Sequence, residues 1–162
     1  MENSDTLIQS NIVIWVDADS CPSLVRNYVV RMGEKHKLRV KFVANKEIPI
    51  TEKGNFEMIV CKEGKDEADN YIYNHSKLGD LVITRDIVFA DRLVQKDITA
   101  INDRGTCFTK DIIKERLSSR DLDLQLYECG LVKHFHEGYD KKKFAQFANC
   151  FDKELHKLLM YY

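Results

Sequence analysis

Ile12-Val13-Ile14-Trp15-Val16-Asp17-Ala18-Asp19 is the stretch that decides the fold. Its consecutive apolar residues are typical of a parallel strand that is buried on both faces, and the run stops abruptly at two carboxylates. Pro22 suits the first turn of a helix, and apolar side chains then recur at helical spacing up to Gly33. The stretch therefore predicts a buried strand followed directly by a helix.

Strands and helices continue to alternate after this unit. Further strands are predicted within residues 37–44, 56–61, 81–84 and 99–101, and helices within 66–77 and 87–96. Two longer amphipathic helices are predicted over 109–128 and 140–159. This order predicts an α/β fold of three layers, with a mainly parallel five-stranded sheet and two extra C-terminal helices. We expect residues 1–11 to form a polar tail and 12–162 to form a single domain.

The composition of the 162 residues narrows the class of protein. With 25 basic and 26 acidic residues the net charge is −1, which excludes a strong overall basic field, so any contact with nucleic acid must be local. Five cysteines without a CxxC pair predict neither a disulfide framework nor a thiolate zinc site. No apolar run approaches the roughly 20 residues that span a bilayer, so we expect a cytoplasmic protein with no membrane contact.

Aspartates follow the predicted strands at the points where the strands end. They are Asp17 and Asp19 after the first strand, Asp86 after the fourth and Asp103 after the fifth, while Asp66 and Asp69 begin the intervening helix. Because the carboxyl ends of parallel strands meet at one edge of the sheet, a shared acidic pocket is expected there. Carboxylates with few histidines nearby favour Mg²⁺ or Mn²⁺ as the cofactor, and phosphoryl transfer as the chemistry.

Each aspartate also has an ordinary structural explanation. An Asp after a strand is a common turn or N-cap residue, and Asp19 or Ser20 can cap the helix that begins near Pro22. Asp66 and Asp69 share a helix face, where acidic residues also complement the helix dipole. Asp103 fits a plain turn better than a metal ligand. A functional site is favoured because all of these aspartates are expected at one edge of the sheet.

Arginines and histidines are the other groups that can carry chemistry. The arginines suited to binding a phosphate, because the guanidinium matches phosphate oxygens in pairs, are Arg85, Arg104, Arg116 and Arg120. His134 and His136 have no nearby Cys or third His, so they are predicted to be surface residues.

Several separate motifs carry a family resemblance. They are Val16-Asp17-Ala18-Asp19-Ser20-Cys21-Pro22, Val43-Ala44-Asn45, Asp66-Glu67-Ala68-Asp69-Asn70-Tyr71-Ile72, Gly79-Asp80-Leu81-Val82-Ile83-Thr84-Arg85-Asp86-Ile87 and Asn102-Asp103-Arg104-Gly105. In this order they resemble the motifs of the bacterial YaiI/YqxD family, also called DUF188 or UPF0178. That family looks like a member of the PIN-like or NYN-like nuclease group.

The resemblance implies roles for individual residues. By analogy with PIN-like nucleases, Asp17 and Asp86 are the catalytic metal ligands at strand ends, and Asp66 or Asp69 is the ligand on the helix. Second-shell or substrate contacts at the rim of the pocket are expected from Asp19, Asn45, Asn102 and Arg104, with Arg120 as a further phosphate contact.

Three functions are compatible with the sequence. The first is a metal-dependent phosphodiesterase that cleaves single-stranded RNA. The second is a phosphatase of the haloacid dehalogenase type, with Asp17 as nucleophile and Asp19 as acid and base. The third is an RNA-binding or interaction module without turnover. A homodimer through the C-terminal helices is compatible with all three.

Overall fold

Strand β1 (Val13–Asp17) forms the centre of the sheet. In the computed structural model, which describes residues 11–64, 66–128 and 138–162, the strand order is β3-β2-β1-β4-β5 and every pairing is parallel. The other strands are β2 (Arg39–Ala44), β3 (Glu57–Val60), β4 (Leu81–Ile83) and β5 (Thr99–Ile101). The predicted five-stranded α/β fold is confirmed. His134 and His136 lie outside the described residues.

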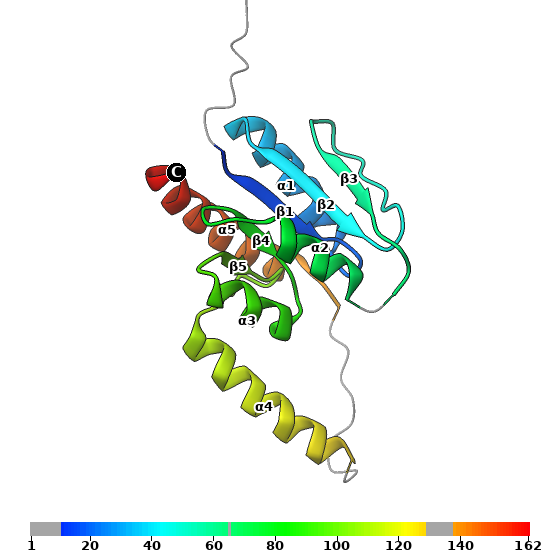
Figure 1. Ribbon diagram of the computed structural model, residues 1–162, viewed down its shortest axis with the longest axis vertical. Helices are drawn as coiled ribbons and strands as arrows, with labels where there is room; N and C mark the ends of the chain where they lie inside the picture. The colour runs from blue at the N-terminus through cyan, green and yellow to red at the C-terminus, as the bar shows by residue number, and fades with distance from the viewer. Residues whose placement is uncertain (1–10, 65, 129–137) are drawn as a thin grey trace, which may run out of the picture.

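Helices cover both faces of the sheet and so complete three layers (Figure 1). Helices α1 (Ser23–His36) and α5 (Lys141–Tyr161) lie on one face, and α2 (Glu67–His75) and α3 (Ile87–Gln95) lie on the other. Helix α4 (Lys110–Glu128) packs beside α3. Among the described residues, no helix combines the length and the apolar character that crossing a membrane requires.

The alternation of side chains along β1 explains why the sheet has a core on each face. Ile14 and Val16 belong to the core under α1 and α5, while Val13 and Trp15 belong to the core under α2 and α3. Successive side chains of a strand point to opposite faces, so an unbroken apolar run supplies both cores at once.

Helix α1 continues three residues beyond the predicted stop at Gly33 and ends at His36. Its C-cap residue Lys37 has φ 57°, the left-handed conformation that ends many helices. Gly33 is needed for packing instead, because a methyl group at that position would collide with the side chain of Val40 on β2. The glycine therefore marks a close approach of helix and sheet, and reading it as a stop signal was wrong.

Candidate metal centre

A hollow of about 330 Å³ opens at the carboxyl ends of the strands. It is lined by Asp17, Asp19, Ser20, Asn45, Asp66, Ala68, Asp69, Arg85 and Asp86. Another hollow, of about 380 Å³, lies near the amino ends of β2 and β3, and Glu34 and Glu57 are its only acidic lining residues. The carboxylates thus gather at one edge of the sheet, in the smaller of these two hollows.

Three of these carboxylates come close enough to share one cation. Asp66, Asp69 and Asp86 each offer an oxygen, and the three oxygens lie within 4.8 Å of one another. Asp66 occupies the N-cap position of α2 with φ 66°, and Asp69 lies in the first turn of the same helix. Asp86 caps α3, and its Oδ1 accepts hydrogen bonds from the backbone N–H groups of Val88 and Phe89. Two helix starts therefore converge on one point.

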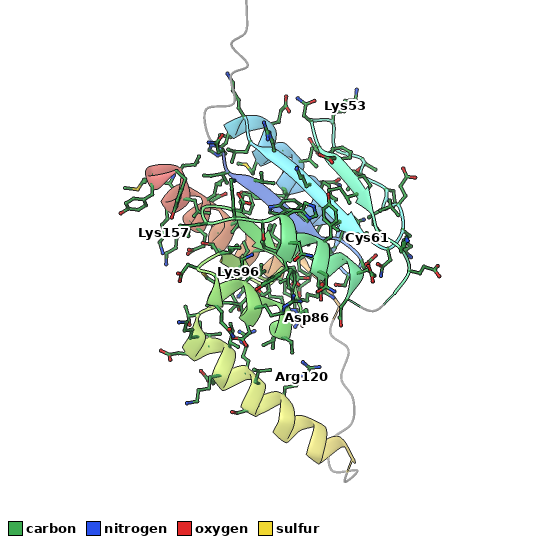
Figure 2. All side chains as sticks on the ribbon, in the orientation of Figure 1. Lys53, Cys61, Asp86, Lys96, Arg120 and Lys157 are labelled. Atoms are coloured by element: carbon green, nitrogen blue, oxygen red, sulfur yellow. The ribbon has the colours of Figure 1, made fainter. Side chains whose placement is uncertain are left out.

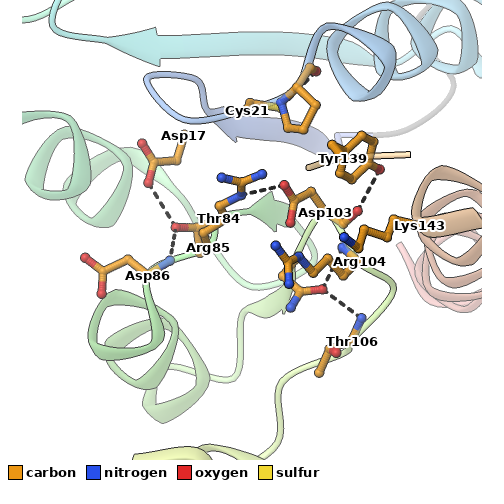
Figure 3. Close-up of polar contacts among 12 residues, drawn as sticks. Asp17, Cys21, Thr84, Arg85, Asp86, Asp103, Arg104, Thr106, Tyr139 and Lys143 are labelled. Atoms are coloured by element: carbon orange, nitrogen blue, oxygen red, sulfur yellow. Dashed lines mark hydrogen bonds and ion pairs between the residues drawn. The ribbon is translucent and has the colours of Figure 1, made fainter. Parts of the chain in front are cut away.

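Asp17 joins this group through Thr84, the residue that follows β4. The Thr84 hydroxyl donates to Asp17 Oδ2 over 2.9 Å and accepts from the backbone N–H of Asp86 over 3.1 Å (Figure 3). A hydroxyl can donate one hydrogen bond while accepting another. Thr84 therefore fixes the side chain of Asp17 relative to the start of α3.

The crowding of negative charge shows in the pKa values of two carboxyls. Burial raises the pKa of Asp17 to about 6, and the charges of Asp19 and Asp86 raise it further against the lowering effect of the Thr84 hydrogen bond. Burial also raises the pKa of Asp69 to about 7, with the charges of Asp17, Asp86 and Asp66 adding to it. A nearby divalent cation would relieve this repulsion.

Asp19 does not cap a helix. The N-cap of α1 is Pro22 and receives no side-chain hydrogen bond, so neither Asp19 nor Ser20 has the predicted capping role. Both carboxylate oxygens of Asp19 instead accept from the backbone N–H of Asn45, at 3.0 and 3.1 Å. Asp19 therefore links the loop after β1 to the end of β2.

Asp103 is more than the plain turn residue that the sequence suggested. It is only 2% exposed, and its Oδ2 lies 2.5 Å from Arg85 Nε. The turn is stabilised by the neighbouring Asn102, whose Oδ1 accepts from the backbone N–H groups of Arg104 and Thr106. Arg85, the partner of Asp103, lies in the loop after β4, so no local sequence pattern could reveal the pair.

The chain is similar to a family of known proteins along most of its length. A family model described as "Uncharacterized BCR, YaiI/YqxD family" matches residues 15–157. The chain belongs to the YaiI/YqxD family. A UPF0178 protein of Treponema denticola is 44% identical over 146 residues, which cover 90% of this chain and 93% of the relative. A UPF0178 protein of Psychromonas ingrahamii is 38% identical, covering 90% of this chain and 97% of the relative. No solved structure matches the chain.

Not all the residues predicted for the rim line the hollow of this YaiI/YqxD protein. Asp19 and Asn45 do, whereas Asn102, Arg104 and Arg120 are not among the lining residues. Arg104 and Arg120 are exposed, and Figure 2 shows Arg120 on α4, apart from Asp86. Their role in binding a substrate stays a prediction.

Thr84 is the residue of the centre that the sequence alone indicates least. It directly follows an apolar strand, where threonines are common, and it carries no charge that would suggest a functional role. Only the pairing of β1 with β4 reveals its position, because that pairing places the ends of both strands side by side.

Proposed function

We propose that this YaiI/YqxD protein is a metal-dependent phosphodiester hydrolase that acts on single-stranded RNA with Mg²⁺ or Mn²⁺. The observation that carries the proposal is the convergence of Asp66, Asp69 and Asp86 within 4.8 Å, with Asp17 held beside them by Thr84. The residues come from the end of β1 and from the starts of α2 and α3, so the arrangement depends on the fold as a whole.

The donor set fits a hard divalent cation. Carboxylate oxygens are the ligands that Mg²⁺ and Mn²⁺ prefer, and neither a cysteine nor a histidine is among the described residues that line the hollow. Burial raises the pKa values of Asp17 and Asp69, and the charges of the neighbouring carboxylates raise them further, so a cation beside these groups would favour their ionised forms. Both features favour a metal centre over an acidic surface without a ligand.

The chemistry divides between the cation and the protein. When bound, the cation lowers the pKa of a water molecule and neutralises charge on the phosphate. Asp66, Asp69, Asp86 and Asp17 would hold it, and a carboxylate of the hollow would accept the proton of the attacking water. In the reaction the water oxygen bonds to phosphorus, the phosphorus–oxygen ester bond breaks, and the leaving oxygen is protonated.

Size and charge favour a single strand as substrate. A hollow of about 330 Å³ is at the small end for ligand sites, and it suits a phosphate with one nucleoside rather than a duplex. The net charge of −1 provides no general attraction to nucleic acid, so contacts at the site itself must provide the affinity.

A phosphatase with Asp17 as nucleophile has less support. That mechanism needs Asp19 as a mobile acid and base, but both oxygens of Asp19 are directed to the single backbone N–H of Asn45, which ties the side chain to the end of β2. Among the described residues that line the hollow, Arg85 is the cation that could hold a phosphate beside Asp17, and no lysine is among them.

The test is cleavage of labelled single-stranded RNA by purified protein in Mn²⁺. Asp17→Asn and Asp86→Asn are expected to slow cleavage by about 100-fold or more, a range typical of lost metal or proton-transfer groups. Asn is also a good N-cap, so Asp86→Asn should keep the start of α3 intact.

Asp111→Asn is the matched control, because Asp111 is exposed in the first turn of α4 and does not line the hollow. It should cleave like the unmodified protein. Cleavage by Asp17→Asn at the rate of the unmodified protein would contradict the proposal. So would binding of RNA without product by the unmodified protein and every variant, and that outcome would favour the binding-module interpretation.

A further inference from the structure

Among the described residues that line the carboxylate hollow, Arg85 is the single cationic one. Five aspartates line the same hollow, namely Asp17, Asp19, Asp66, Asp69 and Asp86. An arginine in such a place would ordinarily pair with one of these carboxylates and so occupy the position of a metal ion. The contacts of Arg85 show that it does not.

Arg85 pairs instead with a carboxylate outside the hollow. Its Nε lies 2.5 Å from Oδ2 of Asp103, and within the described chain it forms no ion pair with an aspartate of the hollow. Figure 3 shows the guanidinium between Asp17 and Asp103, with its Nε directed to Asp103. The pair keeps Arg85 beside the carboxylates without neutralising them.

Asp103 is well placed to hold this arginine. It is 2% exposed, and its backbone carbonyl accepts a hydrogen bond of 2.7 Å from the Tyr139 hydroxyl. Its second carboxylate oxygen, Oδ1, is buried and has no partner among the described residues. An ionised carboxylate that is buried without a charged partner is strongly destabilising, which favours keeping Asp103 paired with Arg85.

Most donors of Arg85 remain available for a ligand. A guanidinium has five N–H groups, and only the Nε–H is used by Asp103. The four N–H groups on Nη1 and Nη2 make no hydrogen bond to the described residues, and the side chain is 43% exposed. Two parallel N–H groups of this kind match two oxygens of a phosphate.

We infer that Arg85 is a phosphate-binding residue of this centre and that Asp103 is the positioning residue which keeps it away from the metal-binding carboxylates. The identity of the phosphate as part of an RNA strand rests on the proposed function. The binding of a phosphate group beside the carboxylates does not, because it needs no turnover.

A purely structural ion pair is the competing explanation. Arg85 and Asp103 connect the loop after β4 to the loop after β5, and a pair of that kind would contribute to stability alone. In that case, removing Arg85 would lower the melting temperature and leave affinity for a phosphate unchanged. The two explanations therefore differ in a binding measurement.

Calorimetric titration with adenosine 5′-monophosphate in Mn²⁺ provides that measurement, beside a titration with Mn²⁺ alone. Arg85→Gln should weaken binding of the nucleotide by about tenfold or more, the loss expected for a charge-assisted hydrogen-bond pair. Its affinity for Mn²⁺ should stay within about twofold of the unmodified protein. Arg85→Lys should be intermediate, because lysine keeps the charge and loses the paired donors.

Asp103→Asn tests the positioning role. Without this partner, Arg85 should pair with the aspartates of the hollow and weaken Mn²⁺ binding by about threefold or more. The double variant Arg85→Gln/Asp103→Asn should restore the Mn²⁺ affinity. Arg31→Gln is the control, since Arg31 is exposed on α1 and pairs only weakly with Glu52, and it should change neither affinity. If Asp103→Asn does not fold, the two Arg85 variants still decide the question.

The outcomes separate this inference from the proposed function. Nucleotide affinity unchanged in Arg85→Gln, or no binding by the unmodified protein at millimolar nucleotide, would overturn the inference even if RNA is cleaved. Loss of nucleotide binding in Arg85→Gln would support it even if no RNA substrate is ever cleaved. Release of inorganic phosphate from the nucleotide would overturn the phosphodiesterase proposal alone.

Discussion

The hydroxyl of Thr84 donates a hydrogen bond of 2.9 Å to Oδ2 of Asp17. This contact lowers the pKa of Asp17, which burial raises. Thr84→Val keeps the shape of the side chain and removes the donor. The pKa of Asp17 should then rise further, so that protons compete more strongly with Mn²⁺, and affinity for Mn²⁺ near neutral pH should fall by about twofold or more.

Thr84→Ser is the matched control, because serine keeps the hydroxyl and loses only a methyl group. It should bind Mn²⁺ almost as the unmodified protein does. Calorimetry at neutral pH measures both variants. Equal Mn²⁺ affinity in the valine and serine variants would show that the hydrogen bond does not prepare Asp17 for a cation.

Stability should depend on pH through Asp17 and Asp69. Their pKa values in the folded protein, about 6 and about 7, lie above the ordinary value of 3.8. The folded protein therefore holds these protons more tightly than the unfolded chain does. Their contribution to stability is complete below about pH 4 and is lost as pH rises through the folded pKa values.

The metal-free protein should therefore lose melting temperature between about pH 5 and about pH 8, and Asp69→Asn should lose less. Because Mn²⁺ binds the ionised carboxylates, it should raise the melting temperature more at the higher pH. Thermal unfolding with and without Mn²⁺ measures both effects. Parallel pH profiles for the protein and Asp69→Asn would contradict the prediction.

At the opposite end of the sheet, a buried Asp80 should be important for stability alone. It is 1% exposed and accepts hydrogen bonds from the backbone N–H of Val13, the indole N–H of Trp15 and the backbone N–H of Lys77. Asp80→Ala leaves these buried donors without a partner, so the free energy of unfolding should fall by about 3 kcal/mol or more.

Urea denaturation measures this loss. Glu115→Ala is the control, since Glu115 is exposed on α4 and its removal should change the unfolding free energy by less than about 0.5 kcal/mol. Asp80→Ala should also keep its affinity for Mn²⁺ in the fraction that is folded. A loss equal to that of the control would mean that Asp80 is dispensable.

The sequence predicted the strands well because their signals are local. Apolar runs located β1 and β4 to within a residue or two, and the predicted bounds of β5 agree with the structure. The sheet edge that collects Asp17 and Asp86 followed from parallel pairing alone. The convergence of the aspartates could therefore be anticipated, whereas their role in metal binding stays a prediction.

Residues whose partners are distant in the sequence have contacts that local patterns did not predict. Asp19 had a plausible local role as a helix cap, but its hydrogen-bond partner is the backbone of Asn45, 26 positions away. Asp103 had a plausible local role in a turn, but it pairs with Arg85, 18 positions away. Local rules assign the nearest compatible role, and tertiary contacts override them where the strands bring other loops together.

The loop that carries Asp103 depends on Gly105. This residue has φ 87°, and a Cβ atom there would lie 2.5 Å from the carbonyl oxygen of Gln146 on α5. Gly105→Ala would therefore impose backbone strain and force the loop and α5 apart, with a loss of about 2 kcal/mol or more in unfolding free energy. Displacing the loop moves Asp103, so nucleotide affinity should fall together with stability.

Gly138→Ala is the control that separates a general effect of adding a methyl group from this close approach. A Cβ atom at Gly138 would have no neighbour within 4 Å in the described part of the chain, apart from the adjoining residues. Its stability and its affinity for adenosine 5′-monophosphate should match those of the unmodified protein. If Gly105→Ala lost stability but bound the nucleotide normally, the position of Asp103 would not control Arg85, and the loop's contribution would be to packing against α5 alone.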